Sequence, residues 1–326
     1  MSEVGVLALT LACGVFISAQ SAEHKRPPAS SVSDVGLSSA IKLVRPSIVQ
    51  IGRRFEISPA EREALHLQSD SLALGTGFIV DVKNGYVVTA LHVAGSGEQP
   101  MVLPNGQPWH PQRDDLRIEI PMPNIKLNSM TFQESFVGVG YTVVARDERH
   151  DLALLKATGQ IENIFYIKTR TQDIRVHPKA GILYLGAIND GDAIAVSGYP
   201  LNSNVLITTS GAIASSDAIN IKEVQLASAP AGFTRPDTAD SYIADVKVNP
   251  GDSGGPMYLV KNGAVIGVCL NFQGAPVMTI INGEQRPVTG PNGEPVMYNS
   301  GLGVFVPAKY VADLLKQNGV KFQSTN

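Results

Sequence analysis

The feature that most constrains the fold of this chain is a succession of short apolar segments rich in Val and Ile. Glycine, asparagine or proline ends most of them, and Lys261-Asn262-Gly263 separates two of them with the turn chemistry of a β-hairpin. Few helical patterns occur and none alternates with these segments, so we predict an antiparallel all-β architecture. The predicted strands are 47–51, 77–80, 86–90, 137–145, 152–156, 193–197, 205–214, 222–227, 242–248, 256–260, 265–270 and 302–306.

Helices are predicted at three places, and two long stretches fit neither kind of element. A short helix is expected over 34–44, a surface helix with a capping box over 59–68, and a terminal helix over about 308–318. The stretches 98–136 and 273–300 are polar or rich in proline and are too long for simple turns. We expect both of them to be surface insertions.

The composition describes a globular chain and excludes several classes of protein. Of the 326 residues, 44% are hydrophobic and 17% are charged, which rules out wholesale disorder. The chain has 26 Lys and Arg against 29 Asp and Glu, a net charge of −3, so nucleic acid and anionic membrane surfaces are not expected partners. Two cysteines, Cys13 and Cys269, are too few for a disulfide-rich scaffold or a four-thiolate zinc site. We expect no cofactor and no metal.

The N-terminal segment 1–22 has the pattern of a secretory signal peptide. Its apolar run over 4–17 is too short to span a bilayer comfortably, and small residues follow it up to Ala22. No Lys or Arg precedes the run, so an uncleaved anchor, a misplaced chain start or a buried helix remain alternatives, as does a lipoprotein signal at Cys13. The segment predicts a periplasmic or secreted protein without a stable membrane span after cleavage, and a polar linker follows over 23–33.

The clearest chemical signal is the hexapeptide Gly251-Asp252-Ser253-Gly254-Gly255-Pro256. Glycines on both sides of Ser253 let the backbone bend so that the N–H groups of Gly251 and Ser253 can converge on one point. Two such donors stabilise the negative oxygen of a tetrahedral intermediate. The pattern therefore indicates a serine nucleophile with its own oxyanion hole.

A serine nucleophile needs a base, and His92 is the best candidate among the six histidines. It stands at the end of the apolar segment 88–93, where the chain turns. The sequence context of four other histidines predicts solvated positions: His24, His66, His110 and His177.

Asp151 is the candidate for the third member, which orients the imidazole of the base. It opens the apolar segment 151–156, and a carboxylate in front of a buried strand is costly unless it is paired. The neighbouring His150 should point to the opposite side of that strand. We therefore expect His150 on the surface.

The chain order His92, Asp151, Ser253 resembles that of trypsin-like serine proteases with the chymotrypsin fold, and within them the HtrA-like (Deg-type) proteases. The resemblance implies two packed six-stranded β-barrels over about 47–157 and 186–306, within a protease domain over 34–319 and before a tail over 320–326. It also implies that His92 is the general base, Asp151 its orienter and Ser253 the nucleophile, in the cleft between the barrels. The matching segments are 40–51, 75–80, 85–93, 151–156, 191–200, 249–256, 265–268 and 301–307.

Three departures from the HtrA-like pattern change what we expect. The residues after 307 are too few for a PDZ domain, so regulation through one is not expected. Asp252 replaces the usual Asn, and its partner is not evident because no activation site precedes the first strand. Cys269 has no partner after signal removal, and we expect a buried strand thiol.

The resemblance also implies where the side chain before the scissile bond is recognised. The pocket base is the residue six before the nucleophile, Lys247, and the pocket wall is Leu270-Asn271-Phe272. A lysine there disfavours cleavage after Arg or Lys. If Lys247 points inward, an acidic side chain is favoured; if it points to solvent or is neutralised by Asp245, the pocket is small and apolar.

The sequence thus predicts a serine endopeptidase that forms an acyl-enzyme and acts on polypeptides, in quality control or processing in the cell envelope. Two alternatives remain open on the same fold. One is a catalytically silent binding or scaffold protein, and the other is an esterase using the same triad. A fluorophosphonate label separates the silent protein from both enzymes, and casein against a small ester separates the enzymes from each other.

Overall fold

The structure is a computed structural model of the chain. It describes residues 31–64, 71–98, 101–102, 108–109, 113–122, 126–127, 130–131, 135–168, 173–175, 177–203, 205–221, 238–281, 283–290 and 293–326. The predicted signal peptide, most of the linker and the predicted strand 222–227 lie outside the described residues.

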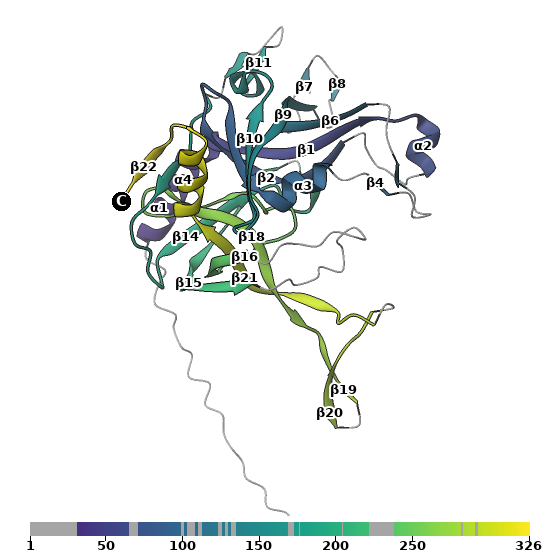
Figure 1. Cartoon of the computed structure of the whole chain (residues 1–326), viewed down its shortest axis with the longest axis vertical. Helices are drawn as coiled ribbons and strands as arrows, with labels where there is room; N and C mark the ends of the chain where they lie inside the picture. Colours follow the sequence, from purple (N-terminus) through teal and green to yellow (C-terminus); the bar gives the residue numbers. More distant parts are fainter. Residues whose placement is uncertain are drawn as a thin grey trace, which may run out of the picture.

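The first half of the chain forms a closed six-stranded barrel, in the upper part of Figure 1. All of its neighbouring strands pair antiparallel. In ring order the strands are β1 (Ile48–Glu56), β2 (Ser71–Asp81), β3 (Tyr86–Ala90), β10 (Leu152–Ala157), β9 (Ser135–Asp147) and β6 (Arg113–Met122). Buried apolar side chains such as Val49, Phe78, Val88, Ile118 and Leu154 form the core of this barrel.

The second half forms an eight-stranded sheet, below the barrel in Figure 1. Six of its strands pair antiparallel in a circuit, because β17 pairs with both β14 and β18. The circuit is β17 (Pro256–Leu259), β14 (Ala193–Gly198), β15 (Ile207–Ile221), β16 (Thr238–Asp245), β21 (Met297–Pro307) and β18 (Val265–Pro276). Two further strands, β13 (Ile182–Tyr184) and β22 (Gln323–Thr325), add to it in parallel.

An apolar cluster joins the two halves and helix α4 (Ala308–Gln317). It contains Phe78 and Leu154 from the barrel, Val268 and Val306 from the second sheet, and Val311 from α4. Burial of these side chains fixes the barrel against the second sheet. The functional groups of the two halves are therefore held in one arrangement.

The all-β prediction with a terminal helix is confirmed, and the remaining elements are short. They are α1 (Ser31–Val44), α2 (Pro59–Ala64), α3 (Leu91–Glu98), the 3-10 turns η1 (Arg45–Ser47), η2 (Ile161–Phe165) and η3 (Pro200–Asn202), and the strands β4 (Met101–Val102), β5 (Pro108–Trp109), β7 (Lys126–Leu127), β8 (Met130–Thr131), β11 (Tyr166–Lys168), β12 (Asp173–Arg175), β19 (Met278–Ile281) and β20 (Glu284–Pro287). No helix among the described residues is long and apolar enough to cross a membrane.

Several sequence-based boundaries differ from the structure. The stretch 98–136 is not a simple insertion, because it contains the barrel strand β6, in which Leu116, Ile118 and Ile120 alternate with charged residues. The helix predicted over 34–44 begins three residues earlier, at Ser31, within the predicted linker. The predicted tail 320–326 contains β22, which pairs with β13. The stretch 273–300 does project from the molecule, as the arm that ends in β19 and β20 (Figure 1).

Candidate active site

The barrel brings His92 and Asp151 together at one end of two neighbouring strands. Leu152 of β10 pairs with Ala90 of β3, so the residue before β10 lies beside the first turn of α3. There the Asp151 carboxylate lies 2.6 Å from His92 Nδ1 and accepts the His92 backbone N–H at 2.8 Å. The Asp151 carbonyl accepts the Leu91 N–H at 2.8 Å.

These contacts define the protonation of the His92 ring. Asp151 is fully buried, and a buried carboxylate is stable only when hydrogen-bond donors replace its water. The proton between Asp151 and the ring therefore belongs on Nδ1, which leaves Nε2 as the basic nitrogen. The side chain of His92 is 15% exposed, so the ring is partly accessible to a substrate.

Ser253 lies in a tight turn that follows the end of β16 and packs against β2. The turn needs glycine, because Gly251 and Gly254 have φ values of +102° and +84°. A Cβ on Gly254 would lie 2.1 Å from the Thr76 carbonyl. Thr76 donates its N–H to the Ser253 carbonyl at 2.8 Å and its hydroxyl to the Gly251 carbonyl at 2.7 Å. A barrel strand thus holds the serine turn of the second sheet.

The Ser253 hydroxyl donates to the Leu270 carbonyl at 2.7 Å. A serine hydroxyl has one proton, so in this arrangement that proton is not directed at His92. The hydroxyl must turn away from the Leu270 carbonyl before His92 Nε2 can accept its proton.

The backbone around Ser253 has N–H groups of two kinds. Those of Asp252, Gly254 and Gly255 donate to carbonyls within the fold. Those of Gly251 and Ser253 donate to no group in the described part of the chain. These two N–H groups are the pair that the sequence pattern predicts for an oxyanion hole.

Asp252 is buried without a cation among the described residues. It is 3% exposed, and its carboxylate accepts the Asn249 N–H at 2.9 Å. Burial raises its pKa to about 6, and the Asn249 hydrogen bond offsets only part of that effect. The Asn249 backbone N–H, in the same turn, is therefore a hydrogen-bond partner of Asp252. The sequence alone did not identify this partner.

The residues predicted to form the specificity pocket lie in different environments. Lys247 is exposed, and Val246 and Val248 beside it are buried in the core of the second sheet. The Leu270 side chain is buried in the apolar cluster that joins the two halves, so its carbonyl is the part that reaches Ser253. Asn271 and Phe272 are half-buried, and Phe272 packs against the core of the second sheet.

The prediction that His150 lies on the surface is wrong. Its ring is stacked against Tyr310 of α4, and the residue is 8% exposed. Single-strand alternation cannot reveal this contact because Tyr310 is distant in sequence. By contrast, His177 is exposed as predicted, and Cys269 is a buried free thiol as predicted. His24, His66 and His110 lie outside the described residues.

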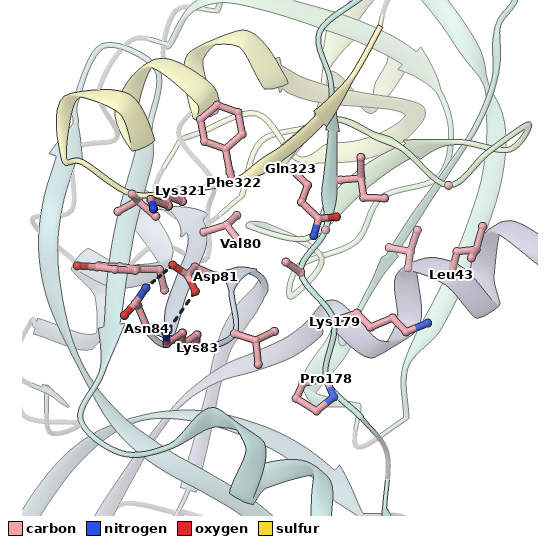
Figure 2. A pocket seen from close by; sticks show the side chains of 18 of the residues that line it. Leu43, Val80, Asp81, Lys83, Asn84, Pro178, Lys179, Lys321, Phe322 and Gln323 are labelled. Atoms are coloured by element: carbon pink, nitrogen blue, oxygen red, sulfur yellow. Dashed lines mark hydrogen bonds between the residues drawn. The ribbon is translucent and has the colours of Figure 1, made fainter.

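A large open groove of about 970 Å³ lies apart from these residues. Figure 2 shows that Asp81 and Asn84 of the β2–β3 turn, Lys179 and the C-terminal Lys321 and Phe322 line it. Within it, the Asn84 amide donates to the Asp81 carboxylate at 2.7 Å. None of the three candidate catalytic residues contributes to the groove.

Comparison with known proteins assigns the family. The trypsin-like peptidase domain family matches residues 75–268, more than half of the chain, and the chain belongs to this family. It is therefore a serine peptidase of the hydrolase class. None of the curated proteins compared with the chain matches it.

Several solved structures have a similar fold. The Rv3671c protease from M. tuberculosis in its active form is 18% identical, over 100% of this chain and 97% of that chain, with a TM-score of 0.48. The MamO protease domain from Magnetospirillum magneticum is 17% identical, over 83% and 96%, with a TM-score of 0.44. The HtrA-type protease AlgW with a decapeptide is 18% identical, over 86% and 66%, with a TM-score of 0.47. At these values the likeness carries no argument about function.

The buried charge of Asp252 predicts a pH-dependent effect of Asp252→Asn. Its pKa of about 6 exceeds the ordinary 3.8, so the folded state holds this proton more tightly than the unfolded state. Wild-type stability therefore falls as the pH rises from about 4 to about 6. We expect Asp252→Asn to raise the free energy of unfolding by up to about 3 kcal/mol at pH 8 and by little at pH 4.

Urea unfolding at the two pH values measures this difference, and Asp245→Asn is the matched control because Asp245 is exposed. An equal gain at pH 4 and pH 8 would show that the ionised carboxylate is not the cause.

Proposed function

We propose that the chain is a serine endopeptidase in which His92, Asp151 and Ser253 form the catalytic triad. The observation that carries the proposal is the fully buried Asp151 carboxylate, 2.6 Å from His92 Nδ1. Burying a carboxylate against an imidazole in this way orients the ring and stabilises the imidazolium that forms when the ring accepts a proton. The glycine turn around Ser253 supports the same assignment from the second sheet.

The proposed reaction begins with rotation of the Ser253 hydroxyl away from the Leu270 carbonyl. His92 Nε2 then removes the hydroxyl proton while Ser253 Oγ bonds to the carbonyl carbon of the peptide. The N–H groups of Gly251 and Ser253 stabilise the oxygen that becomes negative. His92 returns the proton to the leaving amine as the carbon–nitrogen bond breaks, which leaves an acyl-enzyme on Ser253.

Water completes the reaction by the same steps in a second round. His92 removes a proton from the water as its oxygen bonds to the acyl carbon. The proton then returns to Ser253 Oγ as the ester bond breaks, and the carboxylic acid product leaves. Asp151 stays ionised throughout because its role is to orient the ring and to stabilise its positive charge.

Substitution of the triad tests this assignment. We expect Ser253→Ala to lower kcat for casein hydrolysis by roughly 10⁴–10⁶ without unfolding the chain, because the hydroxyl forms the covalent bond. His92→Ala should lose a comparable amount, and the double variant should lose no more than either single variant, because the residues act as a unit. Asp151→Asn should also be severe because it favours the wrong tautomer.

His177→Ala is the matched control, because this histidine is exposed. If the Ser253→Ala protein keeps more than a few per cent of wild-type casein hydrolysis, the assignment is wrong. A wild-type protein that cleaves a small ester but not casein would favour the esterase instead.

The exposed position of Lys247 predicts which substrate side chain is preferred immediately before the scissile bond. We infer that the pocket is small and apolar, since a solvated amine does not line it. Peptides with Val or Leu at that position should be cleaved with kcat/KM roughly tenfold or more above those with Arg. A fluorogenic set with Val, Leu, Glu and Arg measures this, and Lys247→Ala should keep the order.

Arg as the best residue would reject this account of the pocket. Glu as the best residue would reject only its apolar form and would indicate that Lys247 turns toward the bound substrate.

We also propose that segment 1–22 directs export and that the enzyme acts on polypeptides in the cell envelope. The apolar run followed by small residues supports this proposal. N-terminal sequencing of protein recovered from the envelope should give a start near Gln20 or Ala22. An intact Met1 on protein confined to the cytoplasm would contradict it.

A further inference from the structure

His150 lies at the meeting point of the barrel, the second sheet and helix α4. It occupies the turn between β9 and β10, directly before Asp151. Its Nδ1 is 2.7 Å from an Asp147 carboxylate oxygen, and its backbone N–H donates to the other oxygen at 3.2 Å. These two contacts close the turn within the barrel.

The other side of the His150 ring faces the rest of the molecule. Its Nε2 is 3.7 Å from the Asp240 carboxylate of β16, in the second sheet, which is beyond hydrogen-bond distance, and this buried nitrogen has no hydrogen-bond partner among the described residues. The ring stacks on Tyr310 of α4, with 3.7 Å between the ring centres and 16° between the planes. The Tyr310 hydroxyl hydrogen-bonds Asp240, and this bond is the largest cause of the lowered pKa of that carboxyl. Three separate elements therefore meet on one imidazole.

Two described cations lie beside this cluster. Arg149 lies 3.4 Å from Asp240, and Lys309 Nζ lies 4.6 Å from the centre of the Tyr310 ring. Asp240 has a φ of +55°, a conformation that a residue other than glycine keeps only where its surroundings hold it.

Asp151 itself adopts a φ of +52° at the end of the same turn. A residue with a Cβ seldom adopts this left-handed conformation, so contacts on both sides must hold it. Leu91 and His92 hold one side through the bonds to the Asp151 carbonyl and carboxylate. On the other side, the contacts of His150 with Asp147 and Tyr310 hold the residue that precedes Asp151.

The position of this turn matters because the candidate triad is divided between the two halves. His92 and Asp151 belong to the barrel, whereas Ser253 belongs to a turn of the second sheet. A displacement of about 1 Å between reacting groups can cost a hundredfold in rate. A contact that ties the Asp151 turn to the second sheet therefore sets the alignment of the two parts.

We propose that His150 is a positioning residue, which with Asp147, Asp240 and Tyr310 forms a bridge that locks the Asp151 turn onto β16 and α4. The inference rests on the proposed function, since the alignment it sets is that of Asp151 and His92 with Ser253. His150 itself touches no reacting atom.

Two substitutions of His150 distinguish the effect of its contacts with Tyr310 and Asp240 from the effect of its contact with Asp147 in the turn. In His150→Asn the amide can still donate to Asp147, but it is too short to stack on Tyr310 or approach Asp240. In His150→Gln the longer amide can reach toward Asp240. We expect kcat to fall roughly tenfold to a hundredfold in His150→Asn with KM changed less than twofold, and His150→Gln to recover part of the loss.

A double-mutant cycle tests the contact across the two halves. Asp240→Asn and Tyr310→Phe should each lower kcat, and combining Asp240→Asn with His150→Asn should cost less than the sum of the two single effects. His177→Ala is the control histidine and should leave kcat unchanged. Because Tyr310→Phe keeps the aromatic ring, it also tests the bridge if a His150 variant does not fold.

Amide hydrogen exchange gives a readout that does not depend on activity. The Leu91 and His92 amides donate to Asp151, so they should exchange faster in His150→Asn, while the Cys269 amide, bonded to Gly255, should not change. Wild-type kcat together with unchanged exchange in His150→Asn would overturn the bridge. An inactive wild type whose variants still exchange faster would contradict the proposed function and support the anchoring of Asp151.

Discussion

The arrangement of this molecule depends on one buried carboxylate. Asp151 has no exposed surface, so its charge needs hydrogen-bond donors in place of water, and the His92 ring and the His92 backbone N–H both contact the carboxylate. The same contacts orient the ring and direct its basic nitrogen outward. The energetic requirement of the fold and the chemical requirement of a general base are therefore met by one set of hydrogen bonds.

The second constraint is that the two halves must stay aligned. The apolar cluster shared by the barrel, the second sheet and α4 supplies most of this alignment through burial. Polar contacts refine it near the site, where Thr76 of the barrel holds the serine turn and His150 reaches across to Asp240. The candidate site is thus assembled by contacts between residues far apart in the sequence.

The difference between local patterns and contacts between distant residues explains what could be predicted from the sequence. The glycine turn around Ser253 and the apolar segments ending at His92 and Asp151 are local patterns, and local chemistry determines them. The burial of His150 depends on Asp240 and Tyr310, 90 and 160 residues away, so strand alternation alone placed it wrongly on the surface. Strand β6 was missed because most of its residues over 113–119 are charged, although Ile118 and the ion-paired Glu119 are both buried.

The central claim is that Ser253 is a nucleophile activated by His92, and covalent labelling tests it most directly. The folded chain is treated with a fluorophosphonate and the adduct is located by peptide mass spectrometry. The account predicts one adduct per molecule, on Ser253, and its loss in folded His92→Ala protein. A folded wild-type chain that takes no label, or takes it on another residue, would contradict the account and favour a catalytically silent binding protein.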